Sequence, residues 1–295
     1  MIEENEFSRR LVDVETGELI EIKEGDKLKI ITQKQSETIQ SIYKDKELNE
    51  EMKLWNSELG GFIFVLFKYS NELLKDMTQC DIVKLFYLAT YVDYQGYLIY
   101  NHAFMTRKDM QSILGLNRNN FDQFFKKMID LGVITYDKYK NIQVNKSYFT
   151  RGNVENEILK YDNHTRLYIR SIQYLYDHVP KKQHNQLGSY FKLIPYIHRQ
   201  RNILCSNPDS LPEDAEPLTV YDLQTILDCH RHTARKFITD MLKIRLDNDE
   251  AIIGFWRTDY DEGYSKVIVN PRVFYGGNFK VNGGRQDIIR WFERK

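Results

Sequence analysis

Residues 105–129 read MTRKDMQSILGLNRNNFDQFFKKMI, and residues 218–242 read LTVYDLQTILDCHRHTARKFITDML. Aligned at an offset of 113, the two stretches share eight identities in twenty-five positions, and most other positions exchange similar residues. The identities are Thr106/Thr219, Asp109/Asp222, Gln111/Gln224, Ile113/Ile226, Leu114/Leu227, Arg118/Arg231, Phe124/Phe237 and Met128/Met241. Self-similarity of this kind indicates a duplicated structural unit. We therefore treat the stretches as the first copy and the second copy of one element.

Each copy is predicted to form two short helices joined by a turn. Thr106 suits an N-cap because a threonine side chain can accept a backbone hydrogen bond, and Asp109 follows three residues later. Gly115 or its counterpart Asp228 supplies the turn, after which Asn117 or His230 stands at the start of a second helix. Apolar residues define one face of that helix in the first copy: Phe121, Phe125, Met128 and Ile129. This spacing is typical of a helix with one buried side.

The opposite face of each second helix is polar. In the first copy it carries Arg118, Asn119, Asp122, Gln123 and Lys126, and in the second copy Arg231, His232, Arg235, Lys236 and Thr239. A β-hairpin pattern follows each pair, over residues 132–144 and, in a longer form, over residues 251–269. Both copies then close alike, with VNKSYFTRGN from residue 144 and VNPRVFYGGN from residue 269. Two helices followed by a hairpin predict a winged helix in each copy.

The segments before each pair also correspond. Residues 62–77 predict a strand or helix leading into a helix, residues 81–92 a strong helix, and residues 96–100 a short strand paired with the hairpin. Residues 165–176, 188–197 and 202–205 mirror them, and Pro195 should kink or end its helix. The Pro-rich and acidic residues 206–217 are expected to form an exposed connection. Two candidate strands, residues 11–14 and 19–22, form a hairpin with Gly17 at its turn; residues 27–31 are a candidate third strand, and residues 33–55 a charged helix.

Composition bounds the organisation of the chain. A length of 295 residues fits about two domains. We predict a mainly α fold with small β-hairpins (α+β): an acidic arm at residues 1–60, winged helices at residues 61–153 and 165–295, and a linker at residues 154–164. The arm carries 15 acidic and 9 basic residues, a net charge of −6, so a chain of zero net charge leaves +6 for the remainder. The arm is expected to be a solvated surface or to carry assembly contacts.

Other classes of protein find little support in the sequence. No stretch has the roughly twenty apolar residues of a membrane span, and residues 1–10 lack the apolar core of a signal peptide, so a cytoplasmic location is expected. Cys80, Cys205 and Cys229 are isolated, which predicts reduced thiols and neither a disulfide framework nor a zinc site. His230 and His232 stand next to Cys229 without the spacing of metal ligands. No phosphate loop or nucleophile motif is present, no tyrosine sits among recognisable catalytic partners, and we expect neither an enzyme nor a cofactor.

Residues 62–153 resemble a known family. Their FVLFKYSNELL opening, the KLFYLATYVDYQGYLIYN segment, the helix pair and the closing VNKSYFTRGN are similar to RepL-type winged-helix replication proteins of Gram-positive plasmids and phages. If the corresponding residues around the second copy are counted as well, the resemblance covers about two thirds of the chain. The tandem duplication departs from the single-domain members and resembles, in architecture, the twin winged-helix plasmid initiators that bind repeated origin sites.

The resemblance implies a double-stranded DNA partner bound through both second helices. A helix fits the major groove, where Arg pairs with guanine and Asn or Gln with adenine, while Lys contacts phosphates. The candidate DNA-binding residues are Arg118, Asn119, Asn120, Gln123, Lys126, Lys127, Lys138 and Lys140 in the first copy and Arg231, His232, Thr233, Arg235 and Lys236 in the second. Differences between these surfaces predict unlike half-sites, which one chain can hold about one helical turn apart. The wing tip at residues 258–263 is acidic, so this wing is expected to contact protein or stay clear of the duplex.

Three functions fit this reading. The first is a replication initiator that binds repeated or two-half-site origin DNA and contacts host replication proteins. The second is a phage or plasmid transcription regulator, a repressor or activator, with host transcription proteins as partners. The third is a scaffold that uses winged helices to bind proteins. Oligomers are compatible with each of them.

Overall fold

The computed structural model describes residues 9–12, 19–22, 33–66, 73–152, 164–256, 266–277 and 284–293. It is a mixed α+β structure, about half helical, with small antiparallel sheets and hairpins, which confirms the predicted class at this level. The chain divides into two units, Met1–Glu47 and Leu48–Lys295.

The first unit contains an N-terminal hairpin whose second strand lies where predicted, while its first strand is described at residues 9–12 instead of 11–14. Strands β1 (Arg9–Val12) and β2 (Leu19–Ile22) pair antiparallel, with Arg9 opposite Ile22 and Val12 opposite Leu19. The predicted turn at Gly17 and the candidate third strand at residues 27–31 lie outside the described residues. Helix α1 (Gln33–Glu58) confirms the predicted helix and runs from the first unit into the second.

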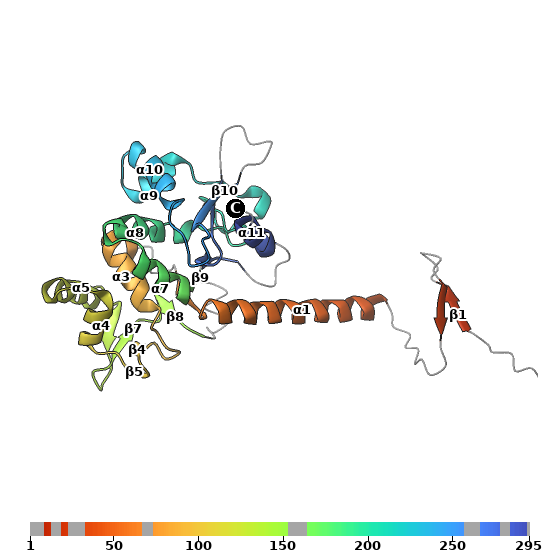
Figure 1. Cartoon of the computed structure of the whole chain (residues 1–295), viewed down its shortest axis with the longest axis horizontal. Helices are drawn as coiled ribbons and strands as arrows, with labels where there is room; N and C mark the ends of the chain where they lie inside the picture. The colour runs from red at the N-terminus through yellow and green to blue at the C-terminus, as the bar shows by residue number, and fades with distance from the viewer. Residues whose placement is uncertain are drawn as a thin grey trace, which may run out of the picture. The chain divides into compact units, whose positions relative to one another are not determined.

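From here on, the first copy denotes residues 62–152 and the second copy residues 164–293. After the end of α1, the second unit continues with the elements of the first copy (Figure 1). In chain order they are β3 (Phe62–Leu66), α3 (Gln79–Ala89), β4 (Ile99–Tyr100), β5 (Ala103–Phe104), α4 (Arg107–Leu114), α5 (Arg118–Asp130), β6 (Ile134–Tyr136), β7 (Ile142–Val144) and β8 (Phe149–Thr150). Of the two alternatives for the opening of residues 62–77, the strand is observed. The segment predicted to pair with the hairpin does so, since Tyr97 bridges Gln143 and the amide of Leu98 donates to the carbonyl of Ile142.

The second copy also has an opening strand, a central helix, a helix pair, a hairpin and a closing strand, and it adds a terminal helix. Its elements are β9 (His164–Tyr168), α7 (Ile169–His178), the 3-10 turn η1 (Lys181–Gln183), α8 (His184–Lys192), η2 (Ile194–Tyr196), η3 (Pro212–Asp214), α9 (Val220–Leu227), α10 (Arg231–Met241), β10 (Ile253–Trp256), β11 (Lys266–Val269), β12 (Phe274–Tyr275) and α11 (Gly284–Glu293). Helix α8 ends before Pro195, as predicted, because proline cannot continue the hydrogen-bond ladder. Helix α11 was not predicted. The acidic wing tip at residues 258–263 lies outside the described residues.

One four-stranded antiparallel sheet joins the two copies. Its strand order is β12-β9-β3-β8, so the inner strands β3 and β9 come from different copies and each outer strand closes its own copy. The inner pair places Phe62 opposite Tyr168 and Leu66 opposite His164. Because two-residue strands such as β8 and β12 contribute little alone, the β3–β9 pair holds this sheet together.

Helices α3 and α8 pack against one another beside this sheet, and their contact depends on a glycine. A Cβ atom at Gly188 would lie 2.0 Å from the carbonyl oxygen of Gln79, where no side chain fits. Around this contact the rings of Phe86 and Phe191 lie 5.0 Å apart, and both contact Phe274. The hydrophobic core therefore runs without interruption from one copy into the other.

The residues of the two predicted winged-helix domains share one sheet and one hydrophobic core. Both predicted domains fall within the unit Leu48–Lys295. Residues 153–163, which contain most of the predicted linker, lie outside the described residues. The boundaries at residues 61, 153 and 165 stay predictions.

We predict that Gly188→Ala lowers the free energy of unfolding by about 1 to 3 kcal/mol, the usual cost of overpacking. Helix propensity alone predicts the opposite sign, since alanine in a helix interior is favoured over glycine by roughly 1 kcal/mol. Urea unfolding of the full chain measures the difference, with Ser189→Ala on the same helix as the control. A Gly188→Ala protein more stable than wild type would show that the close approach of α3 and α8 is not required.

The buried His198 predicts a pH dependence of stability. Its Nδ1 accepts the backbone N–H groups of Gln200 and Arg201 at 3.1 and 3.2 Å, and its Nε2 donates to the carbonyl of Ser210 at 3.1 Å. Burial lowers the pKa of His198 below its ordinary value of 6.5. The unfolded chain therefore takes up a proton below pH 6.5 that the folded chain does not, so the free energy of unfolding falls as the pH drops from 6.5.

Urea titrations between pH 7.5 and 5.5 measure this loss, which should be smaller in His198→Gln than in wild type. His184, whose pKa burial also lowers, keeps part of the effect in that variant. The exposed His230→Gln is the control. Identical pH profiles for wild type and His198→Gln would contradict the assignment.

Candidate nucleic-acid interface

The helix pair of the first copy is fixed by local hydrogen bonds. Thr106 and Asp109 form a capping box, in which the Thr106 side chain accepts the Asp109 amide at 3.2 Å and Asp109 accepts the Thr106 amide at 2.9 Å. These hydrogen bonds lower the pKa of Asp109. Gly115 ends α4 in the left-handed conformation, at φ 62° and ψ 36°, and the side chain of Asn117 then caps α5. Each such cap contributes about 1 kcal/mol.

The second copy builds the same geometry from different residues. Thr219 and Asp222 form an equivalent capping box at the start of α9. Asp228 takes the place of Gly115 in the left-handed conformation, at φ 48° and ψ 59°, which aspartate tolerates better than most residues. His230 occupies the N-cap position of α10 with extended backbone angles, but its side chain forms no capping hydrogen bond. His230 thus stands at the predicted N-cap position, but its side chain does not cap the helix.

Both second helices dock through their apolar faces and leave their polar faces in solvent. The buried residues of α5 are Phe121, Phe124, Phe125 and Met128, and those of α10 are Ala234, Phe237 and Met241. The exposed residues include most of the candidates: Arg118, Asn119, Asn120, Gln123 and Lys126 on α5, and Arg231, His232, Thr233, Arg235 and Lys236 on α10. The Arg118 side chain is 88% exposed.

Lys127 is placed differently from the other candidates. Its ammonium lies 3.5 Å from the carboxylate of Asp81 on α3, and its side chain is 32% exposed. Lys84 pairs with the same carboxylate at 2.9 Å. Although burial opposes ionisation, hydrogen bonds from Lys84 and Thr78 hold the pKa of Asp81 below its ordinary value. Lys127 therefore holds α5 on α3.

Asp122 reduces the positive charge on the exposed face of α5. Arg107 at the start of α4 contacts the Asp122 carboxylate at 2.6 Å, and Arg118 lies 3.9 Å from it. The Arg107 guanidinium also lies over the ring of Phe125, 4.4 Å from its centroid. Neither Arg107 nor this pairing was predicted, because Arg107 lies fifteen residues from Asp122, on the other helix of the pair.

The hairpin β6–β7 carries two more candidates at its tip. Lys138 and Lys140 are exposed, and the ring of Tyr139 between them is 71% exposed. Asp137 folds the tip by accepting the backbone amides of Tyr139 and Asn141, each at 2.8 Å. Burial opposes ionisation of Asp137, but these hydrogen bonds lower its pKa. The tip thus presents two cations and an aromatic ring, and the aromatic contribution was missed in the sequence.

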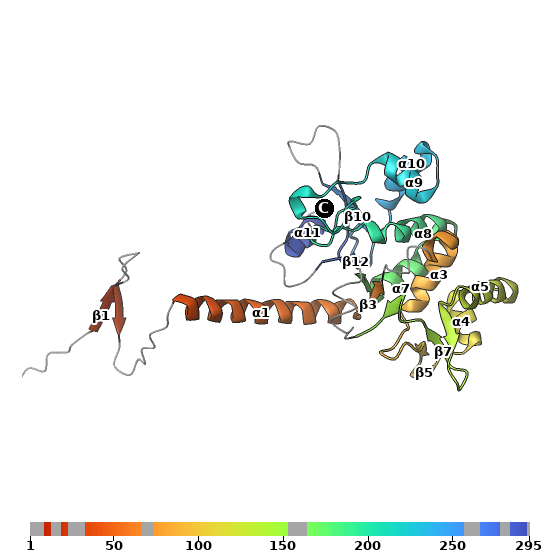
Figure 2. The ribbon, with the colours of Figure 1, turned by 180° about the vertical axis from the view of Figure 1, so that it is seen from behind.

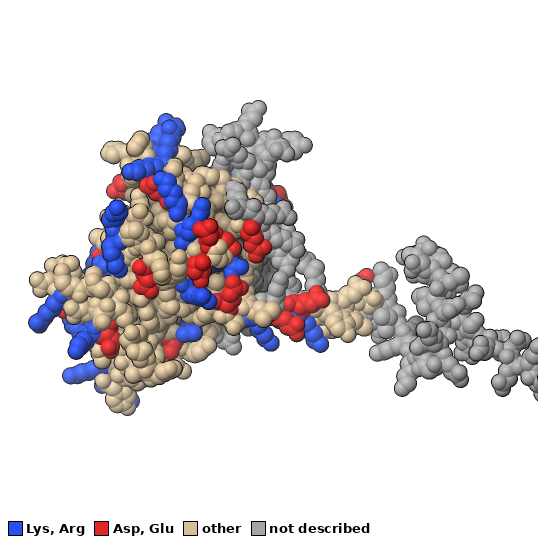
Figure 3. Space-filling view, viewed as in Figure 1, with Lys and Arg blue, Asp and Glu red and all other residues tan. Residues whose placement is uncertain are grey.

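Helix α10 presents the more positive of the two polar faces. At the position equivalent to Asp122 the second copy has Arg235, so three cations, Arg231, Arg235 and Lys236, share the exposed face. Within the described part of the chain, no carboxylate forms an ion pair with any of these three. Figure 3 shows Lys and Arg side chains over α10 and again around α4 and α5.

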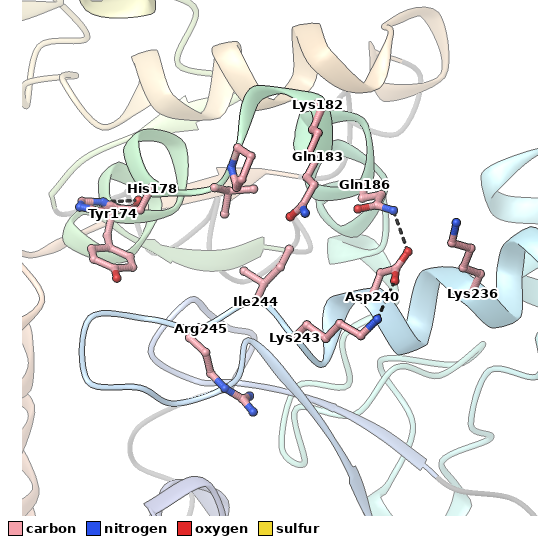
Figure 4. Close-up of a pocket in the computed structure, with 12 residues that line it drawn as sticks. Tyr174, His178, Lys182, Gln183, Gln186, Lys236, Asp240, Lys243, Ile244 and Arg245 are labelled. Carbon is pink, nitrogen blue, oxygen red and sulfur yellow. Dashed lines mark hydrogen bonds and ion pairs between the residues drawn. The ribbon is translucent and has the colours of Figure 1, made fainter.

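A groove of about 550 Å³ lies beside the end of α10. Figure 4 shows Asp240 in this groove between Gln186 and Lys243, with Lys236 nearby on the same helix. Gln186 on α8 donates to Asp240 at 2.8 Å, and Lys243 lies 3.4 Å from the other oxygen. With Lys182 also in the lining, the groove extends the cationic surface of α10.

None of the described helices is long and apolar enough to cross a membrane. No cluster of three or more His, Cys, Asp or Glu side chains capable of holding a metal occurs among the described residues. Cys205 is buried, and burial raises the pKa of its thiol to about 12, so this cysteine is a poor nucleophile.

Comparison of the chain with protein-family models, with curated proteins and with solved structures found no match.

Proposed function

We propose that this chain binds double-stranded DNA sequence-specifically through α5 and α10, as two winged-helix modules. The observation that carries the proposal is the repeated exposure of the second helix. Two stretches of related sequence form the same helix pair, with a Thr–Asp capping box at the start of each first helix, and each directs the polar face of its second helix to solvent. Selection for stability alone would not require both faces to carry arginine at the same position.

The exposed side chains match the chemistry of base recognition. Arginine donates two parallel hydrogen bonds to guanine, whereas asparagine and glutamine pair with adenine, and each good pair discriminates by roughly 1 to 3 kcal/mol. Arg118, Asn119 and Gln123 lie in the first two turns of α5, the part of a recognition helix that faces base edges. The lysines Lys126, Lys138 and Lys140 then supply phosphate contacts.

Within this activity we assign the chain to replication initiation at a plasmid or phage origin. The basis for this role is the resemblance of residues 62–153 to RepL-type proteins. A transcription regulator would use the same surface on an operator. The salt dependence of duplex binding distinguishes an initiator or a regulator from a protein-binding scaffold. DNA binding releases counterions, so its affinity falls steeply as the salt concentration rises.

We predict that the double variant Arg118→Ala, Arg231→Ala loses preference for a duplex selected from a random pool, by about tenfold or more per lost contact. Fluorescence anisotropy against selected and scrambled duplexes, over 50 to 200 mM salt, measures the preference. The exposed Arg201→Ala is the matched control, and thermal melting checks that the fold is kept. Retained preference in the double variant would overturn the assignment of α5 and α10. Absence of wild-type binding at low salt would overturn the function itself.

We also predict that Asp122→Asn strengthens binding to duplex DNA about two- to fivefold at low salt. The carboxylate pairs with Arg107 and Arg118, and exposed charge pairs are worth roughly 0.5 to 1 kcal/mol. The gain should shrink as salt rises. Asp130→Asn, an exposed position at the other end of α5, is the control. An equal gain in both variants would mean that overall charge, and not the face of α5, governs affinity.

A further inference from the structure

The two copies are related by an internal rotation that the strand register reveals. Phe149 and Phe274 occupy the same place in the two closing segments, and they lie opposite Val65 and Leu167. Val65 on β3 is therefore equivalent to Leu167 on β9, two residues whose numbers differ by 102. By the same offset Phe62 corresponds to His164, and Leu66 to Tyr168.

The β3–β9 pair is symmetric under this equivalence. Phe62 lies opposite Tyr168, and Leu66 lies opposite His164, so exchanging the copies exchanges these two pairs. The equivalent residues Phe64 and Arg166 lie opposite one another at the centre. An antiparallel pair that maps onto itself in this way has a twofold axis through its central residues.

Helices α3 and α8 are related by the same twofold axis. Residues of α3 and α8 correspond at an offset of 105. Two pairs of equivalent residues contact each other: the rings of Phe86 and Phe191 lie 5.0 Å apart, and the Cys80 thiol donates to Asn185 Oδ1 at 3.0 Å. In an isologous interface, contacts between equivalent residues occur where the axis passes.

The second helices are docked by equivalent contacts as well. Lys127 pairs with Asp81, while Asp240 accepts a hydrogen bond from Gln186. Gln186 is equivalent to Asp81 at the offset of 105, and Asp240 is equivalent to Lys127 at the offset of 113. Helix α5 therefore contacts α3 at the place where α10 contacts α8. In Figures 1 and 2, α5 lies beside α3 and α10 lies beside α8, as the rotation requires.

We infer that one chain recognises a single composite duplex site made of two half-sites in inverted orientation. A protein twofold axis is mirrored by dyad symmetry in the DNA, whereas copies related by translation would read direct repeats. Arg118 and Arg231 occupy equivalent positions, so each half-site carries a guanine at the matched place. Residues that differ, such as Gln123 against Lys236, make the flanking bases unlike. The target is therefore an imperfect inverted repeat. This inference rests on the proposed DNA binding and adds the orientation and the stoichiometry.

The test starts from a duplex selected with the full wild-type chain and mapped by footprinting. A second probe reverses one half-site in place, which converts the inverted arrangement into a direct one at the same spacing. We expect one chain per duplex by analytical ultracentrifugation on the selected probe. On the reversed probe we expect affinity lower by on the order of ten- to a hundredfold, because one helix loses its base contacts.

Two single variants show which second helix contacts which half-site. Arg118→Ala should relax the sequence preference in one half-site only, and Arg231→Ala in the other only, with the two relaxed positions symmetric about the centre. Equal affinity for the direct probe, or two chains on one selected site, would overturn this inference while leaving DNA binding in place. Failure to bind any duplex would overturn the proposed function and this inference together.

Discussion

The antiparallel contact between β3 and β9, with α3 packed on α8 beside it, is the constraint on which the rest of Leu48–Lys295 depends. Strands β8 and β12 have two residues each, and each pairs with one inner strand, β8 with β3 and β12 with β9. Gly188 permits the close approach of the helices, and four phenylalanines fill the space between helices and sheet: Phe86, Phe149, Phe191 and Phe274. Each helix pair is mounted on this shared base through α3 or α8.

The helix pairs could be predicted from the sequence because their determinants are local. A capping threonine, an aspartate three residues later, a left-handed residue at the turn and apolar residues at helical spacing all lie within 25 residues. The structure places Thr106, Asp109 and Gly115 in those roles, and the second copy does the same with Asp228 at the turn. The exposed polar faces followed from the same periodicity.

The joining of the copies could not be predicted, because it depends on pairing between strands about one hundred residues apart. Nothing in FIFVL or in HTRLY specifies its partner. Ion pairs between separate elements could not be predicted either. In the sequence Lys127 does not differ from an exposed lysine of α5, because its partner Asp81 lies on α3. Helix α11 was not predicted, although its apolar residues Ile288 and Phe292 stand at helical spacing and are buried.

Strand β9 covers an edge of β3 that would otherwise be unpaired. A half-length chain ending after β8 would expose the backbone groups of β3 and the apolar face of α3, and an identical half could cover both. The present chain thus holds within one polypeptide the twofold arrangement that is usual for a homodimer. In a homodimer a substitution appears in both subunits, whereas in this chain a substitution in one second helix leaves the other unchanged, as the exchange of Asp122 for Arg235 illustrates.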